Sequence, residues 1–443
     1  MKCWNAVAFL VFAGGFLYSE ESLSLEQAIE ISIQENLSLT ASKLRALFPE
    51  LQKEIAEEEF AWKFQPRFRI ETREDENEAR AQVVAEKRGS YGTVFRARAE
   101  WIERETRESG GIAELRTEQP LFRRGGKRFT RRNLDRAAYQ RSTSRRRIEQ
   151  ETEALVVRVV EAFTSVIYGR ELEKQEVASL ARADELWRLV KIRKRQGRAT
   201  RVDVLEMDLL RRQAALRLER ITETNIQTQG LLAELLGRVP EQMPPLENVE
   251  LPEEDIPDLK RSETLARENR LDREQALADY AEARRQLSLQ EREIYPDVTL
   301  VATYRPETTI EEENWFAGIT AGRDLDVQVS KLEIQQEEAS VRAALSRLAS
   351  VELQISREVR DAHSQLRTSE RELELAADQV TLSEERYRLA RGLYPSGRVD
   401  AQGLRDAEEE WARSQTAYKD AVLERVRTRY RFWNTLGMLL GET

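Results

Sequence analysis

An internal repeat constrains this chain more than any other feature of its sequence. Four short motifs recur at an interval of 200 residues without a gap, and the first pair is Glu161-Ala162-Phe163 with Asp361-Ala362-His363. The other pairs are Trp187-Arg188-Leu189 with Tyr387-Arg388-Leu389, Gly197-Arg198 with Gly397-Arg398, and Leu236-Gly237 with Leu436-Gly437. Such a series indicates two tandem copies of one structural unit.

Upstream of these motifs the spacing is looser, because the first copy carries extra residues. Glu35-Asn36 resembles Glu268-Asn269 at an offset of 233, and Pro66 resembles Pro296 at 230. The insertion falls in the polar stretch Glu71–Gly111, which we expect to hold strands and a long loop. The five prolines of Val239–Pro257 cannot continue a helix. We therefore predict a first repeat over 20–238, a linker over 239–257 and a second repeat over 258–443.

Both copies carry a heptad pattern, which predicts a long coiled-coil helix. In the second copy every seventh position forms a series, and a companion series of mostly small residues runs beside it. The first series is Leu345, Glu352, Val359, Leu366, Leu373, Val380, Tyr387 and Tyr394. The corresponding helix of the first copy, from about Lys127 to Gln196, would be roughly 100 Å long at 1.5 Å per residue.

The heptad pattern stops at Gly197 and at Gly397, and a second helical pattern follows each glycine. These second patterns run over about 202–236 and 404–436. Each copy is therefore predicted to form a long helical hairpin, with the glycine allowing the reversal. The returning helix is about half as long as its partner. We expect a helix over 25–60, or over 262–293 in the second copy, to stack end to end with it.

Four segments are predicted to be strands: two in the first copy, which alternate with a period of two, and a shorter pair in the second copy. They are Pro66–Thr72, Ile112–Leu121, Asp297–Tyr304 and Trp315–Gly322. One face of each first-copy strand is charged and the other is modestly apolar, which is typical of a barrel with a wet lumen. Four strands cannot close a barrel around a channel. Three chains would supply twelve.

The first nineteen residues have the pattern of a secretory signal peptide: Lys2, an apolar run from Val7 to Leu17, and then Ser19 before acidic residues. The only cysteine, Cys3, precedes the apolar run and would be removed with the signal. No later stretch approaches the roughly twenty apolar residues of a membrane-spanning helix.

Charge and residue types argue against nucleic-acid binding and against catalysis. The net charge is −9 with interspersed signs, so no basic surface for nucleic acid is predicted. The lone His363 has no second histidine to complete a common metal site, and a packing role is favoured. The residues indicate no catalytic group, metal site or cofactor.

Several motifs together resemble the TolC-type outer-membrane efflux protein family, over nearly the whole mature chain. They are Leu25-Glu26-Gln27-Ala28 with Glu35-Asn36, Gln119-Pro120-Leu121-Phe122 with Gly125-Gly126 and Arg128, Gly197-Arg198-Ala199-Thr200 with Val202-Asp203-Val204-Leu205, and Leu235-Leu236-Gly237. Each motif is short, and their order, spacing and duplication carry the resemblance. The Pro-Leu-Phe-x-x-Gly-Gly segment is missing from the second copy.

The resemblance implies a mainly helical fold with a smaller β portion. Long antiparallel hairpins form an α-barrel, and four strands per chain contribute to a homotrimeric twelve-stranded barrel. It further implies location in the outer membrane and periplasm, and a passive export role in a tripartite efflux or type I secretion system. The implied partners are a periplasmic adaptor (membrane-fusion) protein and an inner-membrane transporter. The alternative from the residues alone is a periplasmic or secreted coiled-coil scaffold without a barrel.

The hairpin tips are the predicted functional positions. The resemblance makes them the adaptor-docking end, with the residues Gly197, Arg198, Ala199, Thr200, Gly397, Arg398 and Val399. Asp203 and Glu206, three residues apart, would share one helix face. With Asp406 and Tyr394 they could form a constriction whose carboxylates favour cations. The equivalent of Asp203 in the second copy is Gly403, so the ring would be asymmetric, and ordinary solvated acids paired with Arg201, Arg211 or Arg405 remain an equal alternative.

Overall fold

The computed structural model describes residues 22–72, 77–104, 108–197, 200–249, 256–308, 311–323, 328–393, 398–399 and 401–440. The predicted signal peptide lies outside them. The chain divides into two compact units. One holds the residues up to Leu37 with Ala154–Asp255 and Gln365–Arg431, and the other holds Ser38–Glu153, Ile256–Ser364 and Phe432–Thr443. Each unit contains residues from both halves of the chain.

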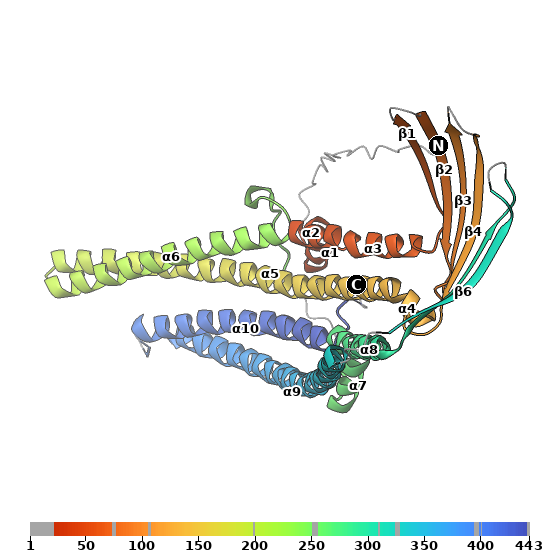
Figure 1. The fold of residues 1–443 in the computed structure, drawn as a ribbon. Coiled ribbons are helices and arrows are strands. Elements are labelled where there is room, and N and C mark those ends of the chain that lie inside the picture. Colours follow the sequence, from red (N-terminus) through yellow and green to blue (C-terminus); the bar gives the residue numbers. More distant parts are fainter. Residues whose placement is uncertain are drawn as a thin grey trace. The chain divides into compact units, whose positions relative to one another are not determined.

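Helices dominate the described residues, and six strands complete them (Figure 1). The helices of the first half are α1 (Leu25–Glu35), α2 (Leu37–Arg45), α3 (Leu47–Glu58), α4 (Lys127–Thr130), α5 (Arg132–Arg195) and α6 (Arg201–Leu235). Those of the second half are α7 (Leu259–Asn269), α8 (Leu271–Gln290), α9 (Gln328–Leu393) and α10 (Ala401–Leu436). Short 3-10 turns span Pro240–Gln242 and Glu291–Ile294.

Each half forms the predicted long hairpin. Helices α5 and α9 have 64 and 66 residues, and α6 and α10 have 35 and 36. At 1.5 Å per residue α5 is about 96 Å long. Three of the predicted helices are interrupted. The expected helix from Lys127 is interrupted at Arg131, where φ is −91° and ψ is 8°. The expected helices over 25–60 and 262–293 are broken as well, at Asn36, Ala46 and Arg270.

Repeated sequence positions contact each other in the same way in the two hairpins. In the first, the guanidinium of Arg211 on α6 lies 5.0 Å from the ring centre of Trp187 on α5. In the second, Trp411 on α10 stacks on Tyr387 of α9, with ring centres 5.1 Å apart. Positions 187 and 211 are each 200 residues before 387 and 411. The sequence repeat is therefore a repeat of helix–helix packing.

A buried polar cluster fixes the register of α5 against α6. Asn225 is buried, and its Nδ2 donates to the Gly169 carbonyl at 3.0 Å and to Glu173 Oε2 at 2.9 Å. A Cβ at Gly169 would lie 2.0 Å from Asn225 Oδ1, so only glycine permits this approach. Because a buried amide costs free energy unless it is bonded, a slip of either helix is disfavoured.

The helix breaks at Asn36 and Arg270 have a common cause. In the first half Asn36 Nδ2 donates to the Leu235 carbonyl at 2.9 Å, at the end of α6. In the second half Arg270 Nη1 donates to the Thr435 carbonyl at 3.4 Å, at the end of α10. Each break therefore supplies a donor to carbonyls that a helix end leaves unsatisfied. The end of each returning helix meets a shorter helix at this point, as the stacking prediction requires.

Gly237 follows α6 at the same place, and we predict that it cannot be replaced. Its φ is +69°, and a Cβ would lie 2.4 Å from the Glu35 carbonyl oxygen. Gly237→Ala should lower protein stability by about 1–2 kcal/mol from the left-handed backbone alone, and the collision adds to that. Gly230→Ala is the matched control, because nothing lies within 4 Å of a Cβ there. In thermal unfolding, Gly230→Ala should leave stability unchanged or raise it. An equal loss of stability in both variants would contradict the special role of Gly237.

The sheet is a six-stranded antiparallel meander, in the order β1-β2-β3-β4-β5-β6. The strands are β1 (Lys63–Thr72), β2 (Asn77–Arg88), β3 (Val94–Arg104), β4 (Gly110–Pro120), β5 (Asp297–Arg305) and β6 (Asn314–Gly322). The four predicted strands are confirmed as β1, β4, β5 and β6. The predicted count of four is wrong, because the insertion Glu71–Gly111 contributes β2 and β3 rather than a long loop.

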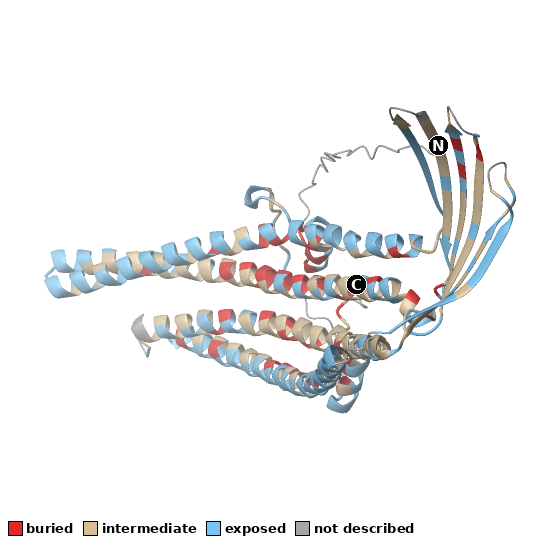
Figure 2. Ribbon diagram, viewed as in Figure 1, coloured by how far each residue is buried: buried red, intermediate tan, exposed pale blue. Residues whose placement is uncertain are grey.

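The heptad seam of α9 is buried over only part of its length (Figure 2). Val359 and Leu366 are fully buried, and Leu373 is half-buried. Leu345, at the start of the predicted series, is 51% exposed. No residue of α9 before Ile355 is buried, so the described residues cover that stretch of the stripe only partly. Among the described residues, no helix is long and apolar enough to cross a bilayer.

Candidate functional site: a two-faced sheet and two hairpins

Strand pairing gathers most of the apolar side chains of the six strands onto one face, which we call the apolar face; Val84, Ile102, Ile112, Val301 and Phe316 lie on the other. Phe68 on β1 pairs with Ala81 on β2, which pairs in turn with Trp101 on β3. The face comprises Phe64, Pro66, Phe68, Ile70, Ala79, Ala81, Val83, Ala85, Phe95, Ala97, Ala99, Trp101, Ala113, Leu115, Leu300, Ala302, Tyr304, Trp315, Ala317 and Ile319. Its charged members, Lys87 and Glu103, stand at strand ends. One side of the sheet is thus suited to an apolar environment.

The opposite face, which we call the charged face, carries interleaved arginines and glutamates. Arg96 on β3 pairs with Glu86 on β2 at 2.8 Å, and Arg305 on β5 with Glu114 on β4 at 2.9 Å. Glu100 is buried between Arg98 and Arg80. Like charges are offset by opposite ones across the strands, so a charged surface is tolerated without large repulsion. The arrangement is that of a polar lumen wall.

Glycines shape the end of the sheet from which the chain enters α4. The β2–β3 turn is closed by a hydrogen bond from the Gly89 N–H to the Thr93 carbonyl at 2.7 Å. Gly92 has φ +94°, and a Cβ there would lie 3.0 Å from Pro120. Gly125 could not carry a Cβ either, since it would lie 2.5 Å from the Pro120 carbonyl oxygen. The Pro-Leu-Phe-x-x-Gly-Gly motif therefore packs the β4–α4 connection against the β2–β3 turn.

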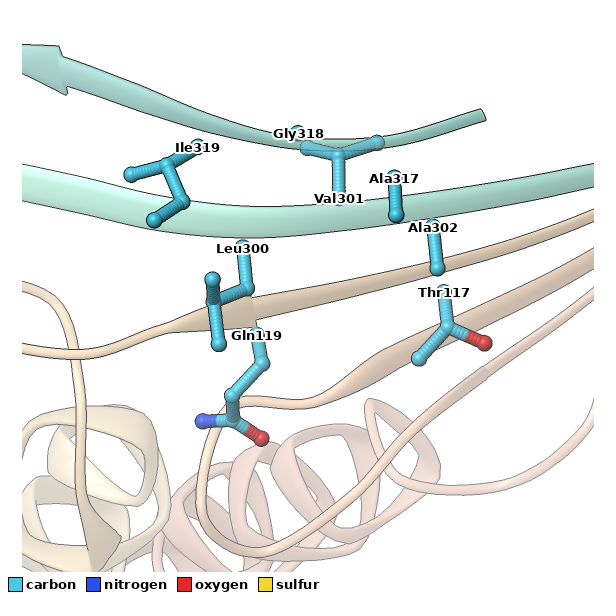
Figure 3. Close-up of a pocket in the computed structure, with 8 residues that line it drawn as sticks. All are labelled: Thr117, Gln119, Leu300, Val301, Ala302, Ala317, Gly318 and Ile319. Carbon is cyan, nitrogen blue, oxygen red and sulfur yellow. The ribbon is translucent and has the colours of Figure 1, made fainter. Parts of the chain in front are cut away.

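A shallow, mainly apolar hollow lies over β4, β5 and β6 (Figure 3). Its lining is Thr117, Gln119, Leu300, Val301, Ala302, Ala317, Gly318 and Ile319. The lining contains no titratable group. The hollow therefore offers packing surface and no acid–base chemistry. Among the described residues no group of three or more histidine, cysteine, aspartate or glutamate side chains could hold a metal ion.

The first hairpin tip is built around Gly197 and Thr200. Gly197 has φ +70°, as the predicted reversal requires. Thr200 caps α6: its Oγ1 accepts from the Asp203 N–H at 3.2 Å, and the Asp203 carboxylate accepts from the Thr200 N–H at 2.7 Å. These bonds, the backbone one first, hold the pKa of Asp203 below its usual range. Asp203 thus has a local capping role that the sequence prediction did not include.

The remaining predicted tip residues are only partly described. Glu206 and Asp406 are exposed on α6 and α10. Arg398 and Val399 fall in a short described stretch, whereas Arg198, Ala199, Tyr394 and Gly397 lie outside the described residues. The predicted constriction is therefore neither assembled nor contradicted within one chain. His363 lies edge-on to Phe432, with ring centres 6.2 Å apart, which confirms its packing role.

A second apolar stripe on the hairpin helices has no cover in the single chain. On α9, Leu375, Leu382 and Leu389 recur every seven residues and are 53–67% exposed. On α6, Val202, Leu209 and Leu216 recur at the same interval and are also exposed. A heptad stripe buries its apolar side chains only against another helix. Among the described residues, these helices therefore carry an apolar stripe that remains largely exposed.

Sequence reasoning expected strands in the insertion Glu71–Gly111 but did not place or count β2 and β3, and the signal that could have placed them is present. Ala79, Ala81, Val83 and Ala85 alternate with mostly charged or polar residues over β2, with Val84 as the exception, and β3 shows a similar pattern. Alanine is depleted in strands, so the alternation is easily taken for loop or helix. The short turn Gly89–Thr93 between the two runs is a hairpin signal.

This architecture is similar to that of known proteins. Residues 264–438 match the model of the outer membrane efflux protein family. The match covers 175 of the 443 residues and lies within the second half of the chain. No protein of curated function matches the sequence.

Several solved outer-membrane proteins share the fold at low sequence identity. The outer-membrane channel OprN is 18% identical, with a TM-score of 0.68 over 93% of this chain and 89% of its own. VceC of Vibrio cholerae is 16% identical, with a TM-score of 0.66 over 93% and 96%. The MtrE outer membrane channel of Neisseria gonorrhoeae, in its open state, is 17% identical, with a TM-score of 0.65 over 94% and 89%. The mainly helical, TolC-like fold with a β portion is thereby confirmed.

Proposed function

We propose that three copies of this chain form an outer-membrane efflux channel, a passive conduit for export across the outer membrane and periplasm. The observation that carries the proposal is the two-faced sheet joined to two long hairpins. Its apolar face suits lipid and its charged face suits a water-filled lumen. Charged strands are unusual in a membrane barrel, so the sequence alone left a coiled-coil scaffold without a barrel as the alternative function. Pairing accounts for those charges, because they share one face.

The uncovered heptad stripes on α6 and α9 support a homotrimer, since they need helices of neighbouring copies. The hairpin tips, at Gly197–Thr200 and 397–399, dock a periplasmic adaptor that connects the channel to an inner-membrane transporter. The channel itself carries out no chemistry in this scheme. Transport energy comes from the transporter.

Cell fractionation and mass measurement test this function. We expect the mature protein in the outer-membrane fraction, extracted only by detergent and with the mass of a trimer plus bound detergent. A soluble periplasmic protein, or a monodisperse monomer in detergent at high concentration, would refute it.

Carboxylates near the tips are proposed to give the channel a cation preference. The variant Asp203→Asn, Glu206→Gln, Asp406→Asn removes three charges per chain, and asparagine at 203 retains a capping oxygen. We expect its cation-over-anion permeability ratio to fall toward about one, measured as reversal potentials in planar bilayers. Because the pKa of Asp203 is lowered, its carboxylate stays charged at a lower pH than that of an ordinary aspartate. The cation preference of the wild type should therefore persist on mild acidification.

Asp208→Asn is the matched control for the tip experiment. It lies on the same helix, five residues beyond Asp203 and two beyond Glu206. Its carboxylate is already paired, with Arg211 at 3.1 Å and Arg212 at 2.8 Å. We expect little change in its selectivity. Unaltered selectivity in the triple variant would show that no carboxylate ring exists, while leaving the channel function intact.

A further inference from the structure

The sheet ends in two open edges. Within the described residues β1 pairs only with β2, and β6 only with β5. The outer N–H and C=O groups of both strands therefore lack sheet partners in one chain. In a bilayer such groups must be satisfied by another strand, because no water is present to replace it.

The two edges fit each other in direction and in chemistry. Neighbouring strands alternate in direction through a meander of six, so β6 runs antiparallel to β1. Phe68 and Ile70 on β1, and Trp315 and Ile319 on β6, all lie on the apolar face and are 69–81% exposed. Joining the edges would continue this face without interruption.

Strand β6 also lacks the features that protect a free edge. Its sequence, NWFAGITAG, contains no charged residue and no proline. Exposed edges are usually guarded by such residues. On the charged face β1 carries Arg67 and Arg69, and β6 presents Gly318 and Thr320 there, so no like charges meet.

We propose that β6 of each copy pairs with β1 of the next, so that three copies close an eighteen-stranded barrel. This rests on the trimer of the proposed function, and it departs from the twelve strands that the family resemblance implies. Barrel diameter grows roughly in proportion to strand number, so the barrel would be about 1.5 times as wide as a twelve-stranded one. The hairpin β2–β3 supplies the extra width, and its Arg96–Glu86 and Arg98–Glu100 pairs line the lumen.

Disulfide cross-linking between neighbouring copies tests the closure. The only native cysteine, Cys3, lies in the predicted signal. Ile319→Cys on β6 is combined in turn with Phe64→Cys, Phe68→Cys or Ile70→Cys on β1, which scans the register of the join. The matched series combines Ile319→Cys with Phe95→Cys, Ala99→Cys or Trp101→Cys on β3. Strand β3 would be the edge if β1 and β2 stood outside a twelve-stranded barrel.

We expect at least one β1 pair, oxidised in outer membranes, to give covalent trimers on a denaturing gel, and no β3 pair to do so. Cross-linking through β3, or through no β1 position, in a protein that is trimeric by mass would overturn the eighteen-stranded closure. The mass measurement on the same samples separates this result from failure of the proposed function, since a non-trimeric protein refutes the channel itself. Strand counting in an electron cryo-microscopy map gives an independent readout, eighteen against twelve.

Discussion

An arginine at Ala81 should prevent the chain from assembling in the outer membrane, whereas an arginine at the adjacent Gln82 should be tolerated. Ala81 lies at the middle of β2 on the apolar face, between Phe68 and Trp101. Gln82 lies on the charged face, between Arg67 and Glu100. The two substitutions add the same side chain at consecutive positions, so they differ only in the face on which it stands.

The expected size of the Ala81→Arg effect follows from membrane transfer. An arginine near the bilayer midplane on the lipid face of a barrel costs about 2–4 kcal/mol. The cost recurs in each of three copies. We expect the yield of heat-resistant trimer in the outer membrane to fall at least tenfold, with Gln82→Arg within a factor of two of wild type. Equal behaviour of the two variants would show that the apolar face does not meet lipid.

The second large effect is expected at Leu366, which is fully buried in the α9 seam. Leu366→Ala removes three carbon atoms from a closed site and leaves a cavity, so it should cost about 2–5 kcal/mol of stability. Thermal unfolding of the purified protein in detergent would report the loss as a lower Tm. Thr368→Ala, at an exposed position two residues further along α9, is the control and should change stability by less than about 0.5 kcal/mol.

The Leu366 experiment also tests the heptad assignment itself. If Leu366→Ala and Thr368→Ala unfold at the same temperature, the site is not packed as the seam requires. A loss at Leu366 with normal membrane insertion would separate helical packing from the barrel, because the residue is remote from the sheet in sequence and belongs to the other compact unit.

Sequence alone determined the helical architecture of this protein. Heptad spacing from Leu345 onward, the reversal at Gly197 and the duplicated Leu-Gly motifs each specify local structure through nearest neighbours along a helix. The structure repeats this duplication in its packing, where Trp187 meets Arg211 and Tyr387 meets Trp411. Such features are local or periodic, so they survive in a linear sequence.

Only the tertiary structure decided the strand count, the register and the roles of certain polar residues. The alternation of small apolar residues with polar ones in β2 gives a weak signal, because an alanine side chain becomes decisive only beside Phe68 and Trp101 on neighbouring strands. Asn225 and Gly169 likewise look unremarkable until the two helices bring them within 3.0 Å. Strand pairing and close helix contacts join residues far apart in the chain, so the energy that favours them is absent from any local window of sequence.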